Sequence, residues 1–253
     1  MSDIEQLFDP LIALLRAEFG DELLGVLATG SRIHGTPGPT SDLDVHVVIA
    51  QPRRQRRNIV LAGAEIEMFI NPAFRVPLYF QDRHPGTIHM FAFGRAIYDP
   101  RDVVAQLQDH ARVLWQAGPV PYQQAELWMP RYFAADMLRD LIDLGEDEAA
   151  AGLQIARLVD QLIEVHCRLQ GRWPGKPKRR LAELADWAPV AAQLARAALA
   201  GGPLAERRAA VERLTEHVLG PIGGPMPLEW QTEWEPLMPP VAADEGRTPK
   251  DEM

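Results

Sequence analysis

The stretch that decides the fold is Gly30–Ile49, which reads GSRIHGTPGPTSDLDVHVVI. From Leu43 onward every second residue is a branched apolar one, which predicts a β-strand with one apolar face. Asp42 and Asp44 lie on the opposite face at the start of this strand. Carboxylates this close repel each other unless a cation or hydrogen bonds offset their charge. An ordinary solvated turn entering a strand is the alternative interpretation of the two aspartates taken alone.

A second segment has the same design. EIEMFI, Glu65–Ile70, places Glu65 and Glu67 on one face of a strand and three apolar residues on the other. If the two strands are neighbours in one sheet, three or four carboxylates converge on its open face. A hard divalent cation with oxygen ligands is then the expected counter-charge, and Mg²⁺ bound by a few carboxylates together with substrate phosphates fits this donor set.

The Gly-Ser pair lies upstream of the aspartates. ELLGVLATG reads as a short buried strand that ends at Gly30, so Gly30 and Ser31 stand where a turn or helix begins. Backbone N–H groups and a hydroxyl at such a position suit phosphate oxygens, and glycine lets a phosphate approach the backbone closely. A helix N-cap is the simpler role for Ser31, and it does not exclude phosphate binding.

The rest of the chain divides into two parts. Helical spacing over residues 4–15 precedes the strands, 52–57 reads as a basic loop, and GRAIYDP, Gly94–Pro100, reads as a short strand. After residue 101 the composition shifts to Leu, Ala, Arg, Glu and Gln, which predicts an all-helical region. Helices are expected at 102–117, 122–144, 147–170, 178–200 and 204–219. The predicted class is α+β: a small mixed-sheet domain over 1–101, a helical bundle over 102–220 and a Pro-rich tail over 221–253 with a disordered end.

Composition narrows the range of partners. The chain of 253 residues has 35 acidic and 26 basic side chains and a net charge of −9, which argues against a nucleic-acid-coating protein. It has a single cysteine, no basic-then-apolar leader and no apolar run long enough to cross a bilayer. We therefore expect a cytoplasmic protein with no membrane partner and no nucleic-acid partner. Nothing in the sequence indicates the oligomeric state.

Taken together, Gly30-Ser31, the Ser-Asp-Leu-Asp-Val segment and a later acid between apolar residues resemble the DNA polymerase beta-type nucleotidyltransferases. The resemblance covers about residues 30–100. It implies that Asp42 and Asp44 bind Mg²⁺, that Gly30 and Ser31 bind the nucleotide phosphates, and that Glu67 is the third carboxylate. Glu65 is the alternative for that third position, because the alternation points it the same way.

The second half more loosely resembles the helical C-terminal domain of aminoglycoside nucleotidyltransferases of the streptomycin type. The likeness is clearest in VHCRLQGRWPGKPKRRLAEL, where a helix ends, Gly-Lys-x-Lys follows and another helix begins. It implies that Lys176 and Lys178 reach the triphosphate, whereas a solvated loop between helices is the alternative. Ile33-His34 in the turn and the short spacing between Asp44 and Glu67 depart from the streptomycin-type pattern, which leaves the acceptor open.

These resemblances imply a Mg²⁺-dependent transfer of a nucleoside monophosphate, AMP from ATP, to a hydroxyl of a small-molecule acceptor, with release of pyrophosphate. An acidic face at Asp136, Asp140 and Asp143 on one expected helix would favour a polycationic acceptor such as an aminoglycoside if it lined the cleft, and a solvated face is the alternative. Antibiotic resistance is one function that such an acceptor would imply. A protein-modifying, antitoxin-like nucleotidyltransferase and a non-catalytic nucleotide-binding regulator are the other functions considered.

Overall fold

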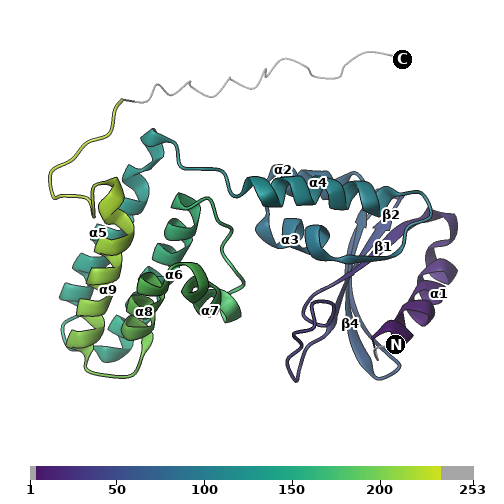
Figure 1. The fold of residues 1–253 in the computed structure, drawn as a ribbon, viewed down its shortest axis with the longest axis horizontal. Coiled ribbons are helices and arrows are strands. Elements are labelled where there is room, and N and C mark those ends of the chain that lie inside the picture. The colour runs from purple at the N-terminus through teal and green to yellow at the C-terminus, as the bar shows by residue number, and fades with distance from the viewer. Residues whose placement is uncertain (1–3, 235–253) are drawn as a thin grey trace, which may run out of the picture.

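The computed structural model describes residues 4–234, which form a sheet body and a helical body side by side (Figure 1). The sheet body holds a five-stranded mixed sheet. Its strands are β1 (Leu23–Thr29), β2 (Leu43–Ile49), β3 (Gln55–Leu61), β4 (Ala64–Pro72) and β5 (Arg95–Tyr98). The predicted α+β class, a mixed sheet followed by a helical bundle, is confirmed.

The order of strands across the sheet is β3-β4-β2-β1-β5. β2 and β4 are parallel neighbours, and the other pairs are antiparallel. Asp44 of β2 lies directly opposite Glu67 of β4 in the register. Because side chains alternate between faces, the register places these two carboxylates on the same face of the sheet. The expectation that the two acidic strands are neighbours is therefore correct.

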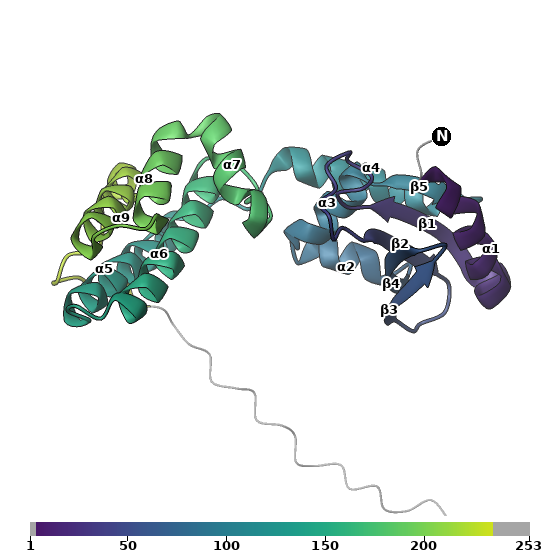
Figure 2. The same cartoon turned by 90° about the horizontal axis from the view of Figure 1, so that it is seen from below.

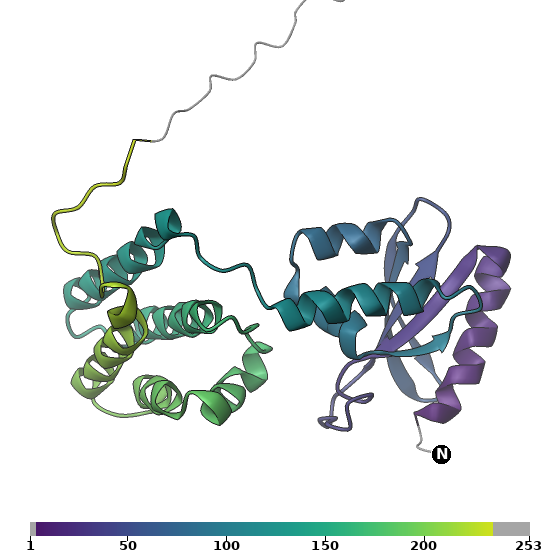
Figure 3. The ribbon, with the colours of Figure 1, turned by 45° about the horizontal axis from the view of Figure 1, so that its top comes forward.

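Helices cover both faces of the sheet (Figures 2 and 3). Helix α1 (Phe8–Phe19) packs on the face formed by Leu43, Val45 and the other apolar alternates of β2 and β4. The opposite face, which carries Asp44 and Glu67 near one end, is covered by α2 (Arg75–Gln81), α3 (Pro85–Phe93) and α4 (Val103–Ala117). Both faces are thus closed by apolar cores, and the carboxylates lie at the rim of one of them.

The helical body is a bundle with its own core. Its helices are α5 (Trp128–Asp143), α6 (Glu148–Leu169), α7 (Pro177–Trp187), α8 (Pro189–Leu199) and α9 (Leu204–Leu219). The single helix expected over 178–200 is two helices, because Pro189 starts a new helix and Ala188 before it, with φ −135° and ψ 65°, is not helical. The basic segment 52–57 is also only partly a loop, since Gln55 begins β3 at the edge of the sheet.

The position of α4 bears on the domain boundary. Val104, Leu107 and Ala111 share a core with Leu27 of β1 and Phe91 of α3. The division at residue 101 is a prediction from composition alone. From this packing we propose that the boundary between the sheet body and the helical body falls in 118–127, after α4.

The tail begins after α9. Trp230 stacks on Trp128 of α5, with ring centroids 5.4 Å apart, whereas the side chain of Trp234 is exposed. The first part of the predicted tail is therefore held against the bundle through Trp230. Residues 235–253, where the disordered end was predicted, lie outside the described residues. Within 4–234, no helix combines the length and the apolarity that a membrane span requires.

Candidate active site

Three carboxylates meet at the start of β2. Asp42 precedes the strand, Asp44 lies in it, and Glu67 comes from the parallel neighbour β4. One oxygen of each lies within 4.8 Å of the others, a spacing that suits a shared metal ion. Glu65 is outside this cluster, and its carboxylate accepts a 2.6 Å hydrogen bond from the side chain of Asn58. We call Asp42, Asp44 and Glu67 the acidic triad.

The negative charge of the triad is only partly compensated at Asp44. Burial raises the pKa of Asp44 above its usual value, and the negative charge of Asp42 adds to the shift, with Glu67 a smaller contributor. Lys176 and Arg56 act in the opposite direction. A partly buried carboxylate with acidic neighbours favours any added cation, because the cation relieves this repulsion.

The Gly30-Ser31 turn lies against the triad. Gly30 has φ +88°, and a Cβ at this position would stand 2.3 Å from Oδ2 of Asp44. Only glycine therefore permits both the backbone conformation and the approach of the carboxylate. The Ser31 hydroxyl donates to the hydroxyl of Ser41 at 2.8 Å, and Thr29, opposite Asp44 in the register, has a buried hydroxyl without a hydrogen-bond partner in the described structure.

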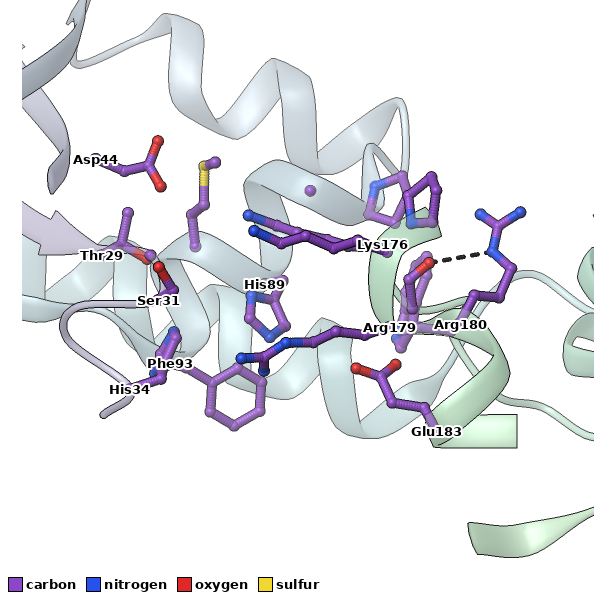
Figure 4. A pocket seen from close by; sticks show the side chains of 18 of the residues that line it. Thr29, Ser31, His34, Asp44, His89, Phe93, Lys176, Arg179, Arg180 and Glu183 are labelled. Atoms are coloured by element: carbon purple, nitrogen blue, oxygen red, sulfur yellow. Dashed lines mark hydrogen bonds between the residues drawn. The ribbon is translucent and has the colours of Figure 1, made fainter. Parts of the chain in front are cut away.

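A cavity of about 820 Å³ opens from the start of β2, beside Asp44, toward the helical body (Figure 4). The sheet body contributes the Gly30-Ser31 turn and two acids of the triad, Asp42 and Asp44, and the helical body contributes the loop before α7. Lys176 and Lys178, the two lysines singled out by the sequence, both line it. The chain has three lysines, and two of them lie in this cleft. Lysine is a compact point charge that suits phosphate binding.

The first turn of α7 concentrates positive charge. Lys176 is the N-cap, and its side chain makes no capping hydrogen bond. Lys178, Arg179 and Arg180 follow, and the turn contains no acid. Cations at this end of a helix oppose the macrodipole, because the helix N-terminus is itself partly positive. An anion that faces the turn, such as a phosphate group, would offset this repulsion.

Two arginines of this turn were not singled out by the sequence, although they follow directly in KPKRR. Arg179 reaches across the cleft and donates to the hydroxyl and the carbonyl oxygen of Thr36, in the loop after Ser31. Arg180 is buried and pairs with Asp160 and Glu164 of α6, and its Nε donates to the carbonyl oxygen of Gly175 at 3.2 Å. Arg180 therefore fixes the loop that presents Lys176.

Aromatic rings form the remaining wall of the cleft. His34 and His89 lie 5.6 Å apart between centroids, and Trp115 stacks on Trp173 at 5.6 Å. Burial, aided by the nearby positive charges of His34, Lys176 and Arg179, lowers the pKa of His89 to about 4, so its ring is neutral at pH 7. The sequence pattern did not identify this wall, because its rings come from segments far apart in the chain.

His46 and the acidic face of α5 lie elsewhere. His46 is buried between Phe69 and Phe91 under α3, and burial lowers its pKa to about 4, so it is a core residue. Asp136 and Asp140 of α5 do not line the cleft; Asp136 faces Arg139 at 3.8 Å, and Asp140 accepts a hydrogen bond from Gln154. The condition that would have favoured a polycationic acceptor is therefore not met.

By fold, the molecule is an α+β protein in which a mixed sheet and a helical bundle enclose a charged cleft. Among solved structures it is similar to a nucleotidyltransferase-like protein from Exiguobacterium sibiricum 255-15, with a TM-score of 0.52 and 15% sequence identity. The match covers 86% of this chain and 75% of that one. No protein-family model matches the sequence, and no curated protein matches it significantly. The likeness concerns the fold, and the chemistry is argued from the site.

Proposed function

We propose that the protein is a Mg²⁺-dependent nucleotidyltransferase that moves AMP from ATP to a hydroxyl of a small-molecule acceptor and releases pyrophosphate. The observation that carries the proposal is that Asp42 and Asp44 of the acidic triad face the cationic first turn of α7 across one cleft. A triphosphate with bound divalent cations has the complementary charges for both walls. The nucleotidyltransferase-like fold supports the same class of reaction.

The residues fit the metal. The triad offers only carboxylate oxygens, the ligands that Mg²⁺ prefers. Burial first and the negative charge of Asp42 second raise the pKa of Asp44, and a divalent cation would offset that charge. Mg²⁺ held by Asp42, Asp44 and Glu67 would supply charge neutralisation at the phosphates. The glycine of the Gly30-Ser31 turn lets the Asp44 carboxylate lie against the backbone, because an added side chain there would displace it.

The protein's own residues divide the remaining work. The Ser31 hydroxyl and nearby backbone N–H groups bind phosphate oxygens from one side, and Lys176 and Lys178 bind them from the other. Glu67 accepts the proton of the acceptor hydroxyl while the hydroxyl oxygen attacks the α-phosphate in line. The bond between the α-phosphorus and the pyrophosphate oxygen breaks at the same time. Arg180 keeps Lys176 in place, and Arg179 ties the two walls together through Thr36.

The test is Mg²⁺-dependent release of pyrophosphate from ATP with a panel of hydroxylated small molecules, aminoglycosides among them. Glu67→Gln and Glu65→Gln form a matched pair, because both side chains lie on the same face of β4 and only Glu67 belongs to the triad. We expect Glu67→Gln and Asp44→Asn to abolish turnover and Glu65→Gln to retain it. Equal turnover in Asp44→Asn and the wild type would refute the scheme. Tight ATP binding without turnover of any acceptor would favour the nucleotide-binding regulator. Turnover with a protein acceptor but with no small molecule would favour the antitoxin-like enzyme.

Lysine labelling gives a second, acceptor-independent measurement. The described residues contain two lysines, Lys176 and Lys178, and both line the cleft. Mg²⁺-ATP should protect both from an amine-reactive reagent, as read by mass spectrometry, while Lys250 near the end of the chain serves as the internal reference. Equal labelling of Lys176 with and without ATP would remove the phosphate role of this loop.

A further inference from the structure

The third carboxylate of the triad already has a cationic partner. Nη2 of Arg56 lies 2.6 Å from Oε1 of Glu67, and Nε of the same guanidinium donates to that oxygen at 2.9 Å. Both bonds fall on Oε1, and Oε2 of Glu67 accepts no hydrogen bond within residues 4–234. Arg56 therefore occupies one side of a carboxylate that the proposed function assigns to a metal.

The strand register explains how Arg56 reaches this position. β3 runs antiparallel to β4, and Arg56 stands directly opposite Phe69, two residues beyond Glu67 on the same face. Long side chains reach such diagonal neighbours across a strand pair. The guanidinium also lies 4.7 Å from the centroid of the Phe69 ring, a cation–π contact that holds it over the strand.

The neighbouring residue shows what is particular to Arg56. Arg57 points to the other face of β3 and forms a two-bond ion pair with Glu18 of α1, at 2.8 and 3.0 Å. An arginine on an edge strand needs no special function, since charged side chains there discourage pairing with another sheet. The two pairs are alike in chemistry and differ in one respect. Glu67 belongs to the triad, whereas Glu18 belongs to no cluster of possible metal ligands within residues 4–234.

Charge then limits how many metal ions the triad attracts. Three ionised carboxylates carry three negative charges, and Arg56 offsets one of them, which leaves the charge of one divalent cation. Arg56 also lowers the pKa of Asp44, so its positive charge acts beyond Glu67. The Arg56 side chain is 68% exposed, so it is free to leave Glu67 when a stronger cation arrives.

We propose that Arg56 is a resident counter-ion of Glu67, so that the nucleotide-free protein binds one divalent cation tightly, at Asp42 and Asp44, and a second reaches Glu67 only by displacing Arg56. This inference rests on the proposed function for the role of the triad. It makes Arg56 a positioning residue that sets the concentration at which the second metal binds.

Mn²⁺ titration without nucleotide, followed by electron paramagnetic resonance, tests the inference independently of turnover. We expect the wild type to bind one Mn²⁺ tightly and a second Mn²⁺ more weakly. In Arg56→Gln the affinity for the second Mn²⁺ should rise about two- to fivefold, the range expected for loss of an exposed ion pair. Arg56→Lys should stay close to the wild type, because it keeps the charge, and Arg57→Gln is the matched control and should not change either affinity.

The outcomes separate the two levels of the argument. An unchanged or lower second affinity in Arg56→Gln, or two equally tight sites in the wild type, would overturn the role of Arg56. If Asp44→Asn nevertheless lost the tight Mn²⁺ site, the metal-binding role of the triad would still hold. A wild type that binds no Mn²⁺ would overturn both the inference and the proposed metal site.

Discussion

Gly30→Ala tests whether the turn and the carboxylate depend on each other as the structure indicates. Gly30 has φ +88°, where an alanine is strained by about 1–2 kcal/mol. Its Cβ would also stand 2.3 Å from Oδ2 of Asp44, and contact at 3.4 Å requires the carboxylate to move by about 1 Å. A displacement of this size in a positioned group costs on the order of 100-fold in rate.

Gly35→Ala is the matched control. Gly35 has φ +70°, so its alanine carries similar backbone strain, but nothing lies within 4 Å of the added Cβ. Thermal unfolding should show both variants destabilised by this backbone strain. Pyrophosphate release and Mn²⁺ binding should fall in Gly30→Ala alone. If Gly35→Ala lost as much activity, or Gly30→Ala kept wild-type Mn²⁺ binding, the proposed contact between the turn and Asp44 would be refuted.

Three further predictions concern charged groups. Arg180→Lys keeps the charge but loses the planar guanidinium that holds Gly175 and pairs with Glu164. The KM for ATP should therefore rise roughly tenfold, about 1.4 kcal/mol, with kcat little changed. A fall in kcat alone would contradict this role. Asp44→Asn should raise Tm without Mg²⁺. Folding raises the pKa of the Asp44 carboxyl, so the folded protein loses stability as the pH rises through that pKa and the carboxyl ionises. Added Mg²⁺ should raise Tm only in the wild type. The pKa of His46 falls from 6.5 to about 4, so as pH drops from 6.5 toward 4 the wild type should lose up to about 3 kcal/mol of stability that His46→Phe retains, measured by urea unfolding at pH 7 and pH 4.5.

The sequence predicted the acidic strands well because a period of two is short and explicit. Alternation alone placed Asp44 and Glu67 on the faces where the structure has them, and parallel pairing then set them opposite each other. Helix α3 was not predicted, since its nine residues are apolar almost all round and show no amphipathic stripe. The start of β3 was misread as a loop because an edge strand rich in arginine lacks an apolar face.

The cationic wall was predicted only in part. Lys176 and Lys178 stood out through a local likeness, whereas the positions of Arg179 and Arg180 depend on partners far away in the chain, at Thr36 and on α6. Such contacts between separate segments of the chain leave no periodic trace in a sequence. The same limit applies to the aromatic wall, in which Trp115 and Trp173 meet only after folding.

The division of the cleft between two bodies has a kinetic consequence. The carboxylates belong to the sheet body, the cations of α7 belong to the helical body, and Arg179 joins the two through Thr36. In the proposed reaction, pyrophosphate would be held between the cations of α7 and metal bound at Asp42 and Asp44, and movement of the bodies about the 118–127 connection would release it. We therefore expect product release to be rate-limiting, so that kcat falls as solvent viscosity increases.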